Sequence, residues 1–296
     1  MSGYLSLSVD LNGIDPQVAE EACFAAGAVS VTLTDAVDDA VLEPAPGEVR
    51  LWPQTVMQAL FPAAAAGPEA IVVLAHALQL PATRIRAQRI ADRVWEREWL
   101  KDFHAMRFGR RLWVVPNHEP APADPAAVMV RLDPGLAFGT GTHASTALCL
   151  TWLDSRLPAN ATVIDYGCGS GVLAVAAARL GARAVHAFDI DPQALIATRD
   201  NAAANDVAAV IQIHTAADAL PQQVDVLIAN ILAGTLIELA PQLCGRLLPG
   251  GQLVLAGILK QQVHEVLAGF APWLKLQVFA ERDGWSALCG PQERHA

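Results

Sequence analysis

The segment TVIDYGCGSGVLA, residues 162–174, decides the fold of the larger part of this 296-residue chain. It reads as a buried strand that ends in an acid, followed by a glycine-rich turn and a helix of small residues. Glycines let the backbone bend sharply and let a ligand approach amide groups that a Cβ would shield. This order predicts the opening unit of a doubly wound, Rossmann-like α/β domain with a ligand at the turn.

The acid before the turn, Asp165, separates two classes of ligand. A dinucleotide-binding turn has the spacing GxGxxG, with its third glycine where this chain has Val172, and it binds a pyrophosphate that a carboxylate would repel. An ammonium or sulfonium ligand is attracted to the same carboxylate. Asp165 with the turn glycines Gly167 and Gly169 therefore predicts a cationic ligand and disfavours an NAD-dependent dehydrogenase.

Two later strand ends supply further candidate site residues. Asp189 ends the second expected strand, where a carboxylate can accept hydrogen bonds from both hydroxyls of a ribose. Asp191 competes for that role, but it precedes Pro192 and is better placed to cap a helix. Asn230 follows the fourth strand, where its amide oxygen can accept an N–H from a substrate amine. The alternative is that Asn230 caps the next helix.

The apolar pattern predicts two domains joined by a connector. After residue 143, strands alternate with helices and predict a mostly parallel, seven-stranded sheet. Its strands are expected at 162–166, 184–189, 209–214, 224–229 and 252–257, with a hairpin formed by 274–280 and 285–289. The expected domains are a small one at 1–80, a helical connector at 81–105 and a larger one at 106–296.

The first 80 residues predict the order βαββαβ of a ferredoxin-like α/β sandwich. Asp15 and Pro16 are expected to begin the first helix, as its cap and first residue. Strands are expected at 4–9, 29–33, 48–52 and 71–74, helices at 15–27 and 55–61, and a long helix rich in Arg and Glu at 82–103.

The net charge of −10 is unevenly distributed. Residues 1–80 contain ten acidic residues and one basic residue, whereas residues 84–111 contain nine basic and four acidic residues. The acids either only keep a small domain soluble or make it a docking surface for a basic partner. In both cases the first domain is a poor surface for nucleic acid, whose phosphates it would repel.

Cysteine spacing and hydropathy exclude several other classes. The five cysteines form no CxxC pair, so neither a zinc site nor a disulfide framework is expected. No charged-then-apolar leader opens the chain, and no apolar run reaches the ~18 residues of a membrane span. We expect a cytoplasmic protein that binds no metal and no membrane and that is a monomer.

A second segment connects the chain with a known family. The glycine turn with Asp165 resembles class I S-adenosylmethionine (SAM) methyltransferases in general. The segment LDPGLAFGTGTH at 132–143, followed by Ser145 and Thr146, together with DYGCGSG at 165–171 and NILA at 230–233, resembles the PrmA family. These are bacterial methyltransferases that act on ribosomal protein L11. Ala144 and Ser145 stand where the family often has Pro-Thr, which leaves Thr146 in place.

The resemblance implies a ferredoxin-like domain that binds the substrate protein, a connector, and a catalytic domain that uses SAM. It implies methylation of the N-terminal α-amine and of lysine ε-amines. The residues implied to contact the cofactor are Thr146, Gly167, Asp189 near the ribose and Asn230 near the methyl group. A basic ribosomal protein as substrate agrees with the acidic first domain.

Some alternatives remain open at this point. His143 is either a catalytic base or, as is commoner for a single histidine at a helix start, a structural residue, with Thr142 as the helix cap. A nucleic-acid amino methyltransferase would place Asn-Pro-Pro-Tyr or Asn-Pro-Pro-Phe after the fourth strand, and Ile231 and Leu232 do not fit that motif. A non-enzymatic cofactor-binding module is disfavoured by Asp165, Asp189 and Asn230.

Overall fold

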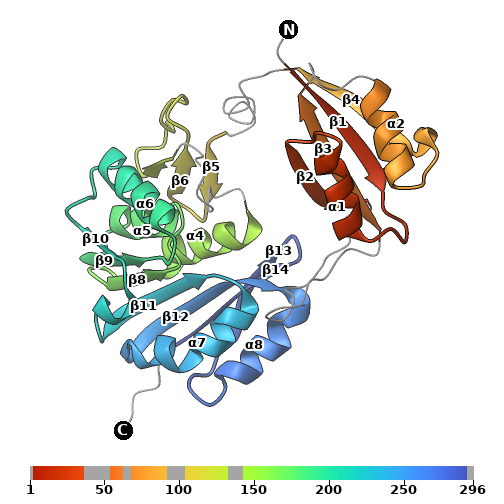
Figure 1. Cartoon of the computed structure of the whole chain (residues 1–296). Helices are drawn as coiled ribbons and strands as arrows, with labels where there is room; N and C mark the ends of the chain where they lie inside the picture. The colour runs from red at the N-terminus through yellow and green to blue at the C-terminus, as the bar shows by residue number, and fades with distance from the viewer. Residues whose placement is uncertain (1–2, 37–53, 63–67, 92–103, 133–142, 292–296) are drawn as a thin grey trace. The chain divides into compact units, whose positions relative to one another are not determined.

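The computed structural model of the chain describes residues 3–36, 54–62, 68–91, 104–132 and 143–291. The chain divides into two compact units, residues 1–95 and 96–296 (Figure 1). Each has a hydrophobic core of its own. Among the helices in the described ranges, none is both long and apolar enough to cross a membrane.

The first unit is a four-stranded sheet with two helices. Its sheet has the order β2-β3-β1-β4, and each described pair of neighbours is antiparallel. As predicted, Asp15 caps α1 through the amide of Gln17, and Pro16 is the first helical residue. The elements are β1 (Gly3–Asp10), α1 (Pro16–Ala25), β2 (Ser30–Asp35), β3 (Thr55–Pro62), α2 (Pro68–Ala77), a 3₁₀ turn (Ala82–Arg84) and β4 (Ile85–Ala91).

Two elements of the first unit differ from the sequence prediction. Residues 55–61, predicted as a helix, belong to strand β3, where Thr55, Met57 and Ala59 are buried at every second position. The alternation is hidden in the sequence because buried Thr55 is polar and half-buried Val56 and Leu60 are apolar. Residues 71–74, predicted as a strand, belong to helix α2. The strand predicted at 48–52 lies outside the described residues.

The helix predicted over 82–103 is wrong for its described part. Ile85–Ala91 forms strand β4, which pairs antiparallel with β1 from Val9↔Ile85 to Gly3↔Ala91. The Arg-rich sequence favours a helix locally, but pairing with a central strand supplies backbone hydrogen bonds that override this preference. Residues 92–103 lie outside the described part of the chain.

The second unit is built on the predicted seven-stranded sheet. Strands β8–β12 run parallel, and β13 and β14 add an antiparallel hairpin at one edge. The sheet elements are β8 (Thr162–Tyr166), α5 (Val172–Arg179), β9 (Ala184–Phe188), α6 (Pro192–Ala204), β10 (Ile211–His214), a 3₁₀ turn (Ala217–Ala219), β11 (Val224–Asn230), α7 (Ala233–Gly245), β12 (Leu247–Leu259), a 3₁₀ turn (Lys260–Gln262), α8 (Val263–Phe270), β13 (Gln277–Arg282) and β14 (Trp285–Pro291).

The strand order β10-β9-β8-β11-β12-β14-β13 reverses direction at β8. From β8 the chain proceeds outward to β9 and β10, and it then crosses to the other side of β8 to form β11. In open α/β sheets the ligand binds beyond the carboxyl ends of the strands at such a reversal. The topology therefore places the candidate site beyond β8, between β9 and β11.

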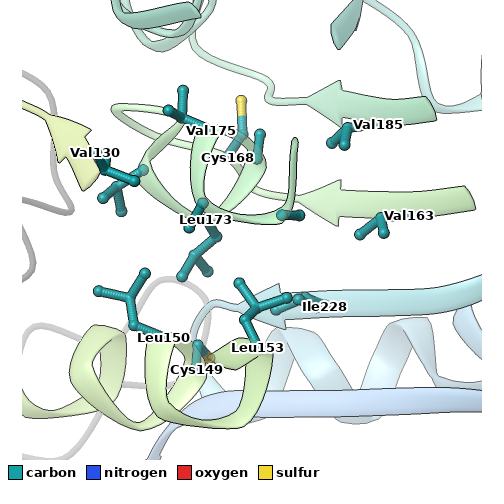
Figure 2. Packing of buried hydrophobic residues seen from close by; sticks show 14 of the residues in the cluster. Val130, Cys149, Leu150, Leu153, Val163, Cys168, Leu173, Val175, Val185 and Ile228 are labelled. Atoms are coloured by element: carbon teal, nitrogen blue, oxygen red, sulfur yellow. The ribbon is translucent and has the colours of Figure 1, made fainter. Parts of the chain in front are cut away.

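Helices cover both faces of this sheet. In Figure 1, α4 (Ala144–Arg156), α5 and α6 lie on one face, and α7 and α8 lie on the other. Figure 2 shows the core under the first of these faces, where Leu150 and Leu153 of α4 point toward Leu173 of α5 and Ile228 of β11 lies beside Leu153. These residues are buried, and the packed core holds the amino ends of α4 and α5 rigidly near the strand ends.

A small sheet extends this unit next to α4. It consists of β5 (Met106–Phe108), β6 (Leu112–Val115) and β7 (Val128–Arg131), in that order. The turn between β5 and β6 binds Asp154 near the end of α4, whose carboxylate accepts the N–H groups of Arg110 and Arg111. This small sheet and the core thus both anchor α4, the helix that carries Thr146.

Candidate cofactor and acceptor site

The site predicted from the sequence assembles at one edge of the large sheet. In the parallel register, Phe188 of β9 pairs with Tyr166 of β8, and Tyr166 pairs with Ala229 of β11. The next residue on each strand is Asp189, Gly167 and Asn230, respectively. These three residues therefore form one row across neighbouring strands, and at a strand spacing of about 4.8 Å the row spans roughly 10 Å.

The glycine turn follows β8 in a conformation that suits glycine. Gly167 has a φ of +79°, and a Cβ added there would lie 2.4 Å from Cγ2 of Ile231, so a larger residue cannot be accommodated without displacement. The Gly167 amide donates to the carbonyl of Phe188 at 2.8 Å, and the Gly169 amide donates to Oδ2 of Asp189 at 2.9 Å. These two amides are therefore bonded within the protein, and the Asp189 carboxylate lies against the turn.

Asp189 is held in place from two sides. Its Oδ2 accepts the Gly169 amide, and its Oδ1 accepts the Asp191 amide at 3.0 Å. Each carboxylate oxygen keeps a further lone pair for a ligand hydroxyl. The competing residue, Asp191, accepts the Gln193 amide at 2.9 Å and caps α6 ahead of Pro192, which confirms its predicted structural role.

Asp165 lies beneath the turn and is only 1% exposed. Its Oδ2 accepts the Ala174 amide of α5 at 3.0 Å, whereas its Oδ1 is buried and has no hydrogen-bond partner. Burial, helped by the nearby charge of Asp189, raises the pKa of Asp165 to about 7 although the Ala174 hydrogen bond lowers it. Asp165 thus supports the start of α5, and its burial disfavours the charged form of its carboxyl group.

Asn230 and Thr146 are 84 residues apart in the sequence and in contact in the structure. The Asn230 Nδ2 donates to Oγ1 of Thr146 at 3.1 Å. Thr146 lies in the first turn of α4 and is 1% exposed, whereas Asn230 is half-buried. This bond fixes the amide plane so that its oxygen, which is an acceptor only, points away from Thr146. Leu232, rather than Asn230, occupies the N-cap position of α7.

His143 begins α4 and is its N-cap. Its Nδ1 accepts the Ser145 amide at 3.4 Å and lies 2.7 Å from the Ser145 hydroxyl oxygen. The ring packs edge-on against Trp285 of β14, with centroids 4.6 Å apart, and burial lowers its pKa. These contacts fit the structural role. The prediction that Thr142 is the helix cap is wrong, because His143 occupies the N-cap position. Thr142 and the rest of the FGTGT segment lie outside the described residues.

Sequence reasoning missed the side chains of α6 that support the turn. The Thr198 hydroxyl donates to the carbonyl of Gly169 at 3.1 Å, and Asn201 donates to the carbonyl of Ser170 at 2.8 Å. Thr198 is fully buried. The available signal was a polar stripe at positions i and i+3 on the inner face of a helix, where apolar residues are expected.

Known proteins resemble this chain over almost its full length. Residues 3–293 match the family described as Ribosomal protein L11 methyltransferase (PrmA). The ribosomal protein L11 methyltransferase of Pseudomonas aeruginosa is 47% identical over 291 residues, which cover 97% of this chain and 98% of the relative. That of Vibrio cholerae is 48% identical over 272 residues, covering 89% of this chain and 90% of the relative.

A solved structure agrees with these relatives. The crystal structure of ribosomal protein L11 methylase from Lactobacillus delbrueckii subsp. bulgaricus matches with a TM-score of 0.59 and 33% identity, over 65% of this chain and 100% of that chain. The resemblance inferred from the sequence motifs is confirmed. The chain therefore belongs to the ribosomal protein L11 methyltransferase (PrmA) family and is a protein methyltransferase.

Proposed function

We propose that this enzyme transfers methyl groups from SAM to the N-terminal α-amine and lysine ε-amines of ribosomal protein L11. The observation that carries the proposal is the row Asp189, Gly167 and Asn230 at the sheet edge, together with the L11 methyltransferases to which the chain is similar. A ribose-binding carboxylate at one end and an amide acceptor at the other suit a nucleoside donor and an amine acceptor.

The residues present fit SAM. Asp189 would accept the ribose hydroxyls, and the ligand would lie beside the turn of Gly167 and Gly169, whose φ angles of +79° and +53° favour glycine. The buried, unpartnered Oδ1 of Asp165 would place a negative charge beneath a cationic ligand. Thr146 would act mainly through Asn230, because its hydroxyl bonds that side chain. When bound, SAM supplies a methyl group on a cationic sulfur, which a neutral amine can attack.

Asn230 is proposed to orient the acceptor. A free lysine has a pKa of ~10.4 and an α-amine of ~7.7–8.0, so a lysine must lose a proton before it can attack. Desolvation next to a cation favours the neutral amine, and the proton can pass to water. The Asn230 oxygen would then accept an N–H of the neutral amine and direct its lone pair. The rate gain would come mainly from alignment.

The first unit is proposed to recognise the substrate. Its βαββαβ order and its strand order β2-β3-β1-β4 support a ferredoxin-like domain. The strong excess of acids in residues 1–80 suits a basic ribosomal protein. We assign recognition to this unit, extended beyond residue 80 to include β4, catalysis to 106–296, and a connecting role to the residues between. A ribosomal-protein substrate implies a cytoplasmic enzyme, proposed to act as a monomer without contacting nucleic acid.

Incubation with labelled SAM and purified L11, followed by mass spectrometry, tests the proposal. We expect methyl groups on the N-terminus and on lysines of L11, and Asn230→Ala should lower turnover more than it weakens donor binding. Purified ribosomal RNA serves as the competing acceptor. Label on RNA alone, or none on the protein, would overturn the proposed substrate.

A further inference from the structure

A glycine of strand β12 lies against the residue that follows Asn230. The pairing of β12 with β14 runs from Leu255↔Leu288 to Ile258↔Ser286 with a shift between them, so β12 contains one extra residue at this point. Such a bulge bends a strand locally. Gly257 occupies it with a φ of +80°, a conformation that favours glycine.

The bulge brings Gly257 against the backbone of Ile231. A Cβ added to Gly257 would lie 2.3 Å from the Ile231 carbonyl oxygen and 2.9 Å from its carbonyl carbon. On the other side of β11, a Cβ added to Gly167 would lie 2.4 Å from Cγ2 of Ile231. Ile231 is therefore held between two glycines, one in the turn after β8 and one in the bulge of β12.

We propose that Gly257 is a positioning residue for methyl transfer, because its bare Cα fixes the Ile231 peptide and thereby the place of Asn230. This inference rests on the proposed role of Asn230. The donor side of the row is built differently. Asp189 and Gly169 bond to each other and do not bond to Gly257 or Ile231. Gly167 of the turn contacts Ile231, whereas the bond between Gly169 and Asp189 does not involve Ile231, so a shift of the Ile231 backbone can displace Asn230 while Asp189 keeps its position.

The structure indicates the size of the effect. Ordinary contacts with a Cβ begin at about 3.4 Å, so Gly257→Ala requires the Ile231 carbonyl to move by about 1 Å. Asn230 is the preceding residue, and its side chain depends on a single 3.1 Å bond to Thr146 for orientation. A misplacement of about 1 Å in an aligned site costs roughly 100-fold in rate.

Gly284→Ala is the matched control for Gly257→Ala. Gly284 has a φ of +79° in the turn between β13 and β14, and nothing lies within 4 Å of a Cβ there. Both variants therefore incur the strain of a positive φ, but only Gly257→Ala adds a clash with the Ile231 backbone, so we expect it to lower the melting temperature more than Gly284→Ala does. Only Gly257→Ala should lower kcat, by roughly 100-fold, and its Kd for S-adenosylhomocysteine should stay within about threefold of wild type.

The results separate this inference from the proposed function. A wild type that methylates no protein would reject the function, whereas an active wild type with equal kcat in both glycine variants would reject only the positioning role. A parallel loss of kcat and S-adenosylhomocysteine affinity in Gly257→Ala would also reject it, because a general distortion would then explain the result.

A second variant keeps the test decisive if Gly257→Ala does not fold. Ile231→Ala removes the side chain that contacts Gly167, and Ile237→Ala is its control, since both isoleucines are partly buried against the same core and Ile237 also contacts a glycine, Gly269. We expect kcat to fall at least about tenfold only in Ile231→Ala. Equal kcat values in the two isoleucine variants would overturn the proposal.

Discussion

The buried carboxylate of Asp165 makes stability depend on pH in a specific direction. Burial raises its pKa from an ordinary value of 3.8 to about 7, so the folded protein keeps a proton that the unfolded chain releases. The free energy of unfolding is therefore greatest below the unfolded pKa, and it falls as the pH rises toward the folded pKa. Above about pH 7 both states are ionised and this contribution becomes constant.

Replacing Asp165 by Asn should remove this dependence. The Asn oxygen can still accept the Ala174 amide, and the uncharged side chain loses no proton as the pH rises. As the pH rises from 5.5 to the folded pKa, the Asp165 contribution to the free energy of unfolding of the wild type should fall by about 1.4 kcal/mol per pH unit. Over roughly one and a half units this amounts to about 2 kcal/mol, and from there to pH 8.5 the contribution stays constant. The free energy of unfolding of Asp165→Asn, relative to that of wild type, should thus be about 2 kcal/mol higher at pH 8.5 than at pH 5.5.

Urea unfolding at the two pH values measures this difference without cofactor. Trp152, one of the seven tryptophans of the chain, is fully buried in the core that contains the turn, so the unfolding of this unit contributes to the change in intrinsic fluorescence. The relevant quantity is the difference in unfolding free energy between variant and wild type (ΔΔG), compared at the two pH values. The cost of burying the new amide group is the same at both pH values and cancels in this comparison. The same ΔΔG at pH 5.5 and 8.5 would refute the account of Asp165.

Three further predictions follow from individual contacts. In a double-mutant cycle, Thr146→Val and Asn230→Ala should couple by about 0.5–3 kcal/mol in kcat, because the two side chains share one bond, and additive effects would argue against a joint role. Asp191→Ala should lower the free energy of unfolding by about 1 kcal/mol in urea melts through loss of the α6 cap, and unchanged stability would contradict that role. Raising the salt concentration from 0.05 to 0.5 M should raise the KM for the basic protein acceptor severalfold and leave kcat nearly constant, because salt screens the charge of the acidic first unit. A KM that does not depend on salt would count against attraction of the substrate by charge.

The catalytic unit was predictable because its sequence signals are local and mutually consistent. Strand β8 occupies the predicted residues 162–166, since the apolar residues Val163, Ile164 and Tyr166 lead directly into a glycine turn. Asp191 was identified as a cap from its position before Pro192, and the structure confirms it. The row of Asp189, Gly167 and Asn230 followed from the rule that parallel strands end at one edge.

The parts that were missed depend on contacts between distant segments. In α2, Val72 and Val73 are 62% and 51% exposed, whereas Leu74 is buried, so the β-branched run that suggested a strand lies on the outer side of a helix. Strand β4 exists because β1 pairs with it, and no local pattern shows that pairing. The packing of Trp285 on His143 likewise joins residues 142 positions apart, and only the folded sheet reveals it.

Calorimetric titration of S-adenosylhomocysteine into wild type, Asp189→Asn and Asp191→Asn tests the central claim most directly. We predict one molecule bound per wild-type chain. Asp189→Asn should bind about 10–100-fold more weakly, since hydrogen bonds to a charged acceptor contribute about 1.5–3 kcal/mol. Asp191→Asn should stay within about threefold of wild type, because Asn caps a helix as well as Asp. No binding to folded wild type, or equal losses in the two variants, would contradict a nucleoside site at the end of β9.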